Sequence, residues 1–426
     1  MITNLYIAKN VYGGDGLGRL GDGRVAFVPG AWAGEQVKAE IVEERRGYVK
    51  ASLIEVVEAS EERLYGMDGT KGTDGTNRTV VPGMVYAGLS YKGECEAKAA
   101  QLVEFLERAR LNPSTIQPFN SSTFQPFNYR NKVVYHFAQQ KGAWVIGYRA
   151  EPSHEIVDIT EDPLARKEIN AKLPEIRKTV LTLLTTGPER IRRETAAKGN
   201  LTIRWTKASG VKWWLGEAPK DLVLTETTLG RDFAVPAGGF YQVNPEVGEE
   251  LVRAVVDEYA KSAASAPEVL DLYCGVGVFG LCANPPKLIG IESGRQAIEF
   301  AKRNADSLFG GRGRSPRGPD SPQIRFFAEE VGKNLRRIPI NARTTVIVDP
   351  PRGGLEKGVA KWLASSPAPK IIYVSCDPAT LVRDLKEICG AGRSGIDPYR
   401  ITNVRWFNMF PRTARFETMV VLEKRS

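Results

Sequence analysis

Two side chains near the C-terminus have the chemical types that covalent catalysis requires. Cys376 lies in YVSCDPATLVRDL (373–385), after an apolar run that predicts a strand and directly before a predicted helix. A helix N-terminus lowers the pKa of a nearby thiol, so Cys376 is a candidate nucleophile. Glu417, in FPRTARFETMVVL, lies between Phe416 and an apolar run. Desolvation there would raise its pKa, as a general base requires.

Both residues also have simpler interpretations. Most cysteines without a partner act as small buried hydrophobic groups, and this is the interpretation for Cys95, Cys274, Cys282 and Cys389. An isolated glutamate at a strand end is commonly solvated.

A glycine-rich turn indicates a nucleotide-containing ligand. In VLDLYCGVGVFGL (269–281), Gly275, Gly277 and Gly280 fit G-x-G-x-x-G, which lets a backbone approach a ligand closely. Glu292 follows the next apolar run and is placed to accept hydrogen bonds from both ribose hydroxyls. Nicotinamide dinucleotides and S-adenosylmethionine both fit this pattern, and the turn alone does not separate them.

The segment VIVDPPRGGL (346–355) favours the second ligand. Asp349 ends an apolar run, and Pro350-Pro351 form a stiff backbone without N–H groups. A plain turn would explain Asp-Pro equally well. However, hydride transfer gives no reason for such a loop, whereas an enzyme that methylates a base would hold it beside the base. Addition of a thiolate to carbon 6 of uracil makes carbon 5 reactive toward a sulfonium methyl group, and a carboxylate must then remove the carbon 5 proton.

The apolar runs around these residues predict the fold. Strands are expected at 268–273, 287–292, 324–328, 344–349 and 370–375, with helices between them and a closing strand pair at the end. This alternation predicts a doubly wound, parallel α/β sheet. Residues 1–60 form short segments between glycine turns, which predicts a small β-barrel. An amphipathic helix is expected at 93–110, and polar loops at 67–80, 113–128 and 310–322.

Composition and charge indicate the type of partner. The 59 Lys and Arg exceed the 50 Asp and Glu by 9, which favours a polyanion, although a generic basic protein has the same surplus. Segment 191–214 places basic residues among tryptophans, which suits contact with an RNA backbone and stacking on its bases; a solvated strand pair with core tryptophans is the alternative. The five cysteines show no paired framework, no apolar run is long enough for a membrane span, and no export signal is visible. We therefore expect a cytoplasmic protein.

The motifs, in this order, resemble those of the RNA 5-methyluridine methyltransferases, and G-D-G-L-G-R with F-V-P-G-A resembles the N-terminal TRAM domain, an RNA-binding barrel. The resemblance implies a TRAM-like, OB-like barrel at 1–60, a central α+β RNA-binding domain at 61–240 and a class I methyltransferase domain at 241–426. It implies Cys376 as nucleophile and Glu417 as base. It also implies S-adenosylmethionine as methyl donor, contacted by Gln242, Tyr273, Gly275, Glu292, Glu330 and Asp349, with Phe240 and Asn244 nearby.

Three departures from the family pattern matter. Many relatives bind an iron–sulfur cluster through four cysteines, but Leu64 to Tyr91 contains none and Asp162 stands at the fourth position, so we expect no cluster and no metal site. Glu329 or Glu330 replaces an aspartate that contacts the adenine in relatives. Arg415 stands where relatives often have histidine.

The sequence therefore predicts S-adenosylmethionine-dependent methylation of uridine carbon 5 in ribosomal or transfer RNA, through a covalent Cys376 adduct. A nicotinamide-dependent oxidoreductase and a catalytically idle RNA-binding factor are the alternatives. A monomer is expected.

Overall fold

The computed structural model describes residues 1–64, 79–113, 116–117, 124–150, 153–310, 322–333, 335–390 and 398–425. Most of the polar loops expected at 67–80, 113–128 and 310–322 therefore lies outside the described residues. Within the described part of the chain, no helix has the length and apolar character needed to cross a bilayer.

The N-terminal strands form a six-stranded sheet with the order β1-β5-β6-β4-β3-β2. Its strands are β1 Ile2–Tyr6, β2 Lys9–Asn10, β3 Gly16–Arg19, β4 Val25–Val28, β5 Gln36–Glu44 and β6 Tyr48–Glu58. Between β1 and β2, the Ile7 N–H donates to the Glu35 carbonyl and the Ala8 N–H donates to the Leu17 carbonyl. This short stretch of chain therefore forms hydrogen bonds with the strands near both edges of the sheet. The sheet therefore closes into a barrel, and its small apolar core is a hydrophobic cluster of its own.

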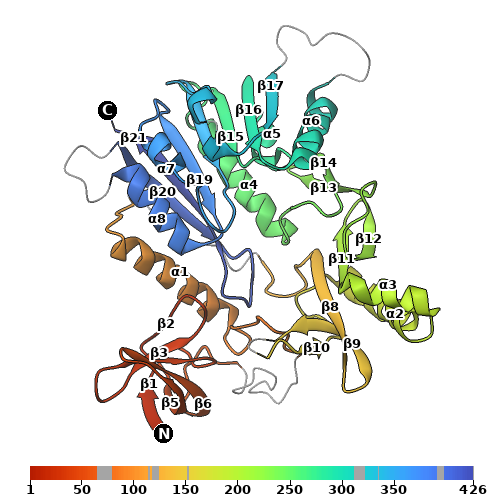
Figure 1. Ribbon diagram of the computed structural model, residues 1–426. Helices are drawn as coiled ribbons and strands as arrows, with labels where there is room; N and C mark the ends of the chain where they lie inside the picture. The colour runs from red at the N-terminus through yellow and green to blue at the C-terminus, as the bar shows by residue number, and fades with distance from the viewer. Residues whose placement is uncertain are drawn as a thin grey trace.

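Helix α1 (Tyr91–Arg108) lies between this barrel and the C-terminal sheet (Figure 1). The amphipathic pattern of 93–110 predicted this helix. Its apolar residues Leu102 and Leu106 pack into the same hydrophobic cluster as the C-terminal strands. Residues of the same turns, Gln101 and Glu104, bond to Asn10 and Lys9 of β2. This helix thus connects the two ends of the chain.

The central region contains a five-stranded sheet with the order β10-β9-β8-β11-β12 and a two-stranded ribbon, β13-β14. Helices α2 and α3 accompany the sheet, and its core is a second hydrophobic cluster. The elements are β8 Lys132–Gln140, β9 Ala143–Arg149, β10 Ile156–Asp158, α2 Lys167–Thr185, α3 Glu189–Lys198, β11 Asn200–Thr206, β12 Gly210–Leu215, β13 Val223–Thr228 and β14 Arg231–Pro236. The domain boundaries at 60/61 and 240/241 stay a prediction.

The C-terminal region is an eight-stranded sheet with the order β17-β16-β15-β18-β19-β21-β20-β7. Its strands are β7 Ile116–Gln117, β15 Glu268–Leu272, β16 Lys287–Glu292, β17 Gln323–Ala328, β18 Thr344–Val348, β19 Lys370–Ser375, β20 Tyr399–Phe407 and β21 Glu417–Lys424. The accompanying helices are α4 Pro245–Ala260, α5 Val278–Ala283, α6 Arg295–Phe309, α7 Val359–Ala364 and α8 Pro378–Cys389, with two short 3₁₀ turns at Val331–Lys333 and Leu335–Arg337. The five predicted parallel strands and the closing pair are confirmed.

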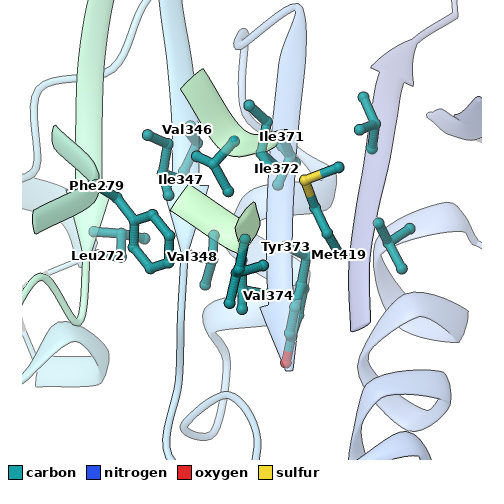
Figure 2. Packing of buried hydrophobic residues seen from close by; sticks show 14 of the residues in the cluster. Leu272, Phe279, Val346, Ile347, Val348, Ile371, Ile372, Tyr373, Val374 and Met419 are labelled. Atoms are coloured by element: carbon teal, nitrogen blue, oxygen red, sulfur yellow. The ribbon is translucent and has the colours of Figure 1, made fainter. Parts of the chain in front are cut away.

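The strands at the centre of this sheet are buried along their whole length and mostly apolar because both faces of the sheet are covered. All residues of β18 and β19 are buried. Figure 2 shows Val346 to Val348 packed beside Ile371 to Val374, with Leu272, Phe279 and Met419 around them. This core fixes the strand ends where the candidate site residues lie.

The strand order also distinguishes a nicotinamide-dependent oxidoreductase from a methyltransferase. The dinucleotide-binding fold has six parallel strands in the order 3-2-1-4-5-6. Here β21 is antiparallel to both neighbours and lies between β19 and β20. This arrangement is that of a class I methyltransferase, and the predicted fold class is confirmed.

Candidate active site

Strand register brings the two candidate catalytic residues to one edge of the sheet. The carboxyl ends of β15, β18 and β19 meet there because these strands are parallel. Strand β21 runs the other way, so its first residue, Glu417, lies at the same edge. Ser375 pairs with Thr418, which places Cys376 and Glu417 at adjacent ends of neighbouring strands.

Cys376 is half-buried, and its pKa differs in direction from the sequence prediction. Burial raises the pKa of the thiol to about 12, and the carboxylates of Glu417, Asp349 and Asp377 add to the effect. The expectation that the helix N-terminus would lower this pKa is therefore wrong. The main physical reason is the burial of the thiol. The helix cap contributes as well: Asp377 accepts hydrogen bonds from the Ala379 and Thr380 N–H groups, so the positive end of α8 is bonded to a carboxylate next to the thiol.

Glu417 is enclosed, with 4% of its surface exposed. Burial, and then the charge of Asp349, raise the pKa of its carboxyl well above its usual range. This is the direction that the sequence predicts for a general base. The preceding residue, Phe416, is completely buried and packs edge-on against Trp406.

Asp349 follows β18, and its backbone N–H donates to Leu272 of β15. Burial raises the pKa of its carboxyl to about 7. The loop after it is held by α8: Leu355 donates its N–H to the Asp384 carboxylate, which also accepts from the Tyr373 hydroxyl. Sequence analysis missed Asp384 and Tyr373 as supports of this loop, because neither has a pattern that distinguishes it from an ordinary helix or core residue.

A cavity beside Asp349 contains four of the six predicted donor-binding residues, namely Gln242, Tyr273, Gly275 and Asp349. The end of β13 and the segment before α4 complete its wall. Other lining residues are Thr227, Thr228, Phe240, Tyr241, Pro245, Gly248, Val252, Cys274, Val276, Val278 and Phe279. The threonines and Tyr241 had no sequence signal, and the Tyr241 and Thr228 hydroxyls form a hydrogen bond of 2.5 Å.

The glycine turn at the cavity is tight. Tyr273, Gly275 and Gly277 have φ angles of 62°, 53° and 89°, a left-handed conformation that favours glycine. A Cβ on Gly275 would meet nothing within 4 Å, so space for a ligand exists there. At Gly280 a Cβ would lie 2.6 Å from Leu288, so this glycine is required by helix–strand packing instead.

The other two predicted donor ligands lie outside this cavity. Glu292 accepts hydrogen bonds from the Gly294 N–H (2.7 Å) and the Ser293 hydroxyl (3.0 Å). Glu330 forms an exposed ion pair with Lys333. The Glu329 N–H donates to the Glu292 carbonyl, so the three carboxylates lie on neighbouring strand ends. Their roles stay predictions.

The residues at two positions where the sequence departs from the family's iron–sulfur pattern lie in the protein interior. Asp162 is completely buried and accepts from the Tyr135 and Tyr148 hydroxyls at 3.1 and 2.7 Å, so it supports the central sheet. Cys95 is buried in α1. Within the described ranges, no three His, Cys, Asp or Glu side chains are grouped as metal ligands. The absence of an iron–sulfur cluster stays a prediction.

The basic and aromatic segment 191–214 is divided by the fold. Arg204 and Trp214 are buried, and Arg204 forms a 2.8 Å ion pair with Glu226, so both belong to the core. Trp213 is 37% exposed. The exposed basic residues of the segment are Arg192, Arg193, Lys198, Lys207 and Lys212.

Fold and site together define a class I methyltransferase joined to an N-terminal β-barrel. Residues 325–425 match the family model described as tRNA (Uracil-5-)-methyltransferase, and residues 7–54 match the TRAM domain. The predicted resemblance is therefore confirmed, and the protein is an enzyme of the RNA (uracil-5-)-methyltransferase type.

Full-length relatives support this result. An uncharacterized RNA methyltransferase of Thermotoga maritima is 27% identical, covering 100% of this chain and 99% of the relative. A protein of the same description from Streptomyces avermitilis is 29% identical, covering 98% and 97%. Among solved structures, the tRNA (uracil-54, C5)-methyltransferase of Pyrococcus abyssi in complex with S-adenosyl-L-homocysteine has a TM-score of 0.68 at 22% identity, covering 98% of this chain and 100% of that chain. At this identity the last comparison shows the fold alone.

Proposed function

We propose that the protein methylates carbon 5 of a uridine in structured ribosomal or transfer RNA, through a covalent adduct with Cys376. The observation that supports this most is the register of β19 and β21, which brings Cys376 and Glu417 together at the edge of the sheet. A protein that only binds RNA would need neither residue, and neither would an enzyme that transfers a hydride.

The cavity fits S-adenosylmethionine, which when bound supplies an electrophilic methyl group. Its wall combines aromatic surface from Tyr273 and Phe279 with polar groups from Gln242 and the open side of Gly275. Pockets for small ligands have this composition, with a few polar groups that fix the orientation. Gln242, Tyr273, Gly275 and Asp349 would hold the donor, with Glu292 and either Glu329 or Glu330 at its nucleoside end.

The carboxylates explain how a thiol with a high pKa can react. The Cys376 thiol must lose its proton as the sulfur adds to carbon 6 of the uracil. Asp349 has a pKa of about 7 and lies within electrostatic reach of the thiol, so at neutral pH it is suited to accept that proton. The addition turns carbon 5 into the nucleophile that takes the methyl group.

Glu417 then removes the carbon 5 proton, and elimination of the Cys376 sulfur restores the ring. Because its pKa is well above the usual range, its carboxylate is a stronger base than a solvated glutamate. The target base must be extruded from the RNA to reach this edge. The exposed basic residues of α3 and β12, together with Trp213, are suited to bind the surrounding RNA backbone and bases. We further propose that the protein works in the cytoplasm.

The experiment compares Cys376→Ala and Glu417→Gln with wild type on transcribed ribosomal and transfer RNA, with methyl transfer and protein–RNA adducts as readouts. Cys376→Ala should lose methyl transfer and form no adduct. Glu417→Gln should form a covalent adduct that resists denaturation, because the sulfur cannot leave until the proton is removed.

Two matched substitutions control for general damage. Cys389→Ala removes a buried thiol at the far end of α8, and Glu423→Gln removes a charge from the far end of β21. Both should leave transfer near wild type. Normal methylation by Cys376→Ala would refute the covalent mechanism, and the absence of an adduct with Glu417→Gln would remove Glu417 from the role of base.

A further inference from the structure

The loop between β2 and β3 of the N-terminal barrel extends to the active-site edge of the C-terminal sheet. Its Tyr12 ring packs edge-on against Phe105 of α1, with centroids 5.7 Å apart, and against Phe416 at 6.1 Å. Phe416 directly precedes Glu417. A barrel residue is therefore part of the support beneath the proposed base.

The Tyr12 hydroxyl contacts the other catalytic candidate through Asp377, which directly follows Cys376. The hydroxyl donates to Asp377 Oδ2 at 3.3 Å, and Arg415 Nη1 lies 3.8 Å from the same oxygen. The second oxygen, Oδ1, accepts from the first turn of α8 at 3.0 and 3.1 Å. Each oxygen of this carboxylate thus has its own partners, and Tyr12 defines the orientation of one of them.

The loop is held firmly enough to position a side chain. Gln101 of α1 donates its amide to the carbonyls of Asn10 and Val11 at 3.3 and 3.1 Å. Gly14 has a φ of 100°, and a Cβ there would lie 2.7 Å from the Val85 side chain. The Gly14 N–H closes the turn on Val11 at 2.9 Å. These contacts fix the backbone on both sides of Tyr12.

We propose that Tyr12 is a positioning residue of the active site, which holds the Asp377 carboxylate next to Cys376 and supports Phe416 next to Glu417. It does not touch the reacting atoms itself. The proposal rests on the function proposed above for Cys376 and Glu417, and it assigns the N-terminal barrel a part in the catalytic step in addition to any contact with RNA.

The charges around the thiol show why the orientation of Asp377 matters. Three carboxylates face Cys376: Glu417 from β21, Asp349 from the end of β18 and Asp377 from the start of α8. Among the described residues, the cation that forms an ion pair with one of them is Arg415, which lies 3.8 Å from Asp377. The Tyr12 hydroxyl and Arg415 together offset the negative charge of Asp377, the residue that follows Cys376 in the chain. Without the hydroxyl, that charge acts more strongly on the thiolate.

The test substitutes Tyr12→Phe, which keeps the ring and removes only the hydroxyl. Its first readout is the rate at which iodoacetamide alkylates Cys376 in the full-length protein, measured by peptide mass spectrometry between pH 7 and 10. A hydrogen bond to a charged group is worth roughly tenfold in an equilibrium, but this one is made to Asp377 and not to the sulfur. Only part of it reaches the thiol, so the substitution should lower the rate at each pH by about threefold. The second readout is methyl transfer, where kcat should fall by a similar factor while KM for RNA changes by less than about twofold.

The control is Tyr6→Phe in the same barrel, because Tyr6 is 55% exposed. It should change neither readout. If Tyr12→Phe does not fold, Arg415→Gln probes the same oxygen of Asp377 and should slow alkylation in the same way. An alkylation profile identical to wild type overturns the proposal, and so does a change in KM alone. If wild type transfers no methyl group while Tyr12→Phe still slows alkylation, the proposed function fails and the positioning role stands.

Discussion

Asp271, at the end of β15, should make the stability of the protein depend on pH in an unusual direction. Its carboxyl is completely buried, with Oδ2 accepting from the Gly280 N–H at 2.9 Å and Oδ1 without a partner among the described residues. Burial is the main cause that raises its pKa from 3.8 to about 7. The folded protein therefore keeps a proton that the unfolded chain loses between these two pH values.

The sign and size of the effect follow from this difference. Stability is highest below the unfolded pKa and falls as pH rises toward 7, by about 4 kcal/mol in total. Roughly 2.5 kcal/mol of that develops between pH 5 and pH 8. Asp271→Asn removes the titration, and its amide oxygen can still accept from Gly280. Its free energy of unfolding should thus increase relative to wild type across this interval by about 2.5 kcal/mol.

Chemical unfolding of both proteins, followed by tryptophan fluorescence at pH 5 and pH 8, measures the difference. Exposed Asp257→Asn on α4 is the matched control and should give a difference that does not change with pH. The partnerless Oδ1 becomes an amide N–H in Asn, which adds a cost that is the same at both pH values. If the difference between wild type and Asp271→Asn is equal at pH 5 and pH 8, the assigned protonation of Asp271 is wrong.

Two further predictions concern buried ion pairs. Glu226→Gln leaves Arg204 buried without a counter-charge, so it should lower the free energy of unfolding by about 3–5 kcal/mol in denaturant melts, whereas Glu226→Asp should cost less. Lys98→Met should cost less, about 1–3 kcal/mol, because the completely buried Glu94 loses its 2.7 Å partner and Asn408 loses a donor, while Arg412 stays 3.6 Å from Glu94. The loop before β21 should loosen with loss of methyl transfer, and a free energy of unfolding equal to that of wild type would mean that the pair does not stabilise the fold.

The parallel strands and the site at their carboxyl ends were predictable because apolar runs and strand-end residues are local patterns. The pairing of Cys376 with Glu417 came from the family resemblance, and only the register of β19 and β21 gives it a geometric reason. The pKa of the thiol was predicted in the wrong direction. Sequence analysis counted the helix dipole, but it did not count the burial of the sulfur, nor the three carboxylates of Glu417, Asp349 and Asp377 that act on it.

Long-range contacts account for what the sequence could not show. Arg204 looks like an RNA-binding residue beside Trp205, and only the packing of the β13-β14 ribbon turns it into a buried partner of Glu226. Tyr12 and Asp377 are separated by 365 positions. No periodicity or spacing within either segment predicts that they meet.

The place of β21 has a consequence for biosynthesis. This strand lies between β19 and β20, yet it is made after every other strand that the structure describes in this sheet. While the chain grows on the ribosome, β19 and β20 therefore lack the strand that lies between them, and their exposed edges can pair with other chains. The proposed base arrives on the same late segment, so a partly made protein could expose the thiol but would have no means of releasing an RNA bound to it.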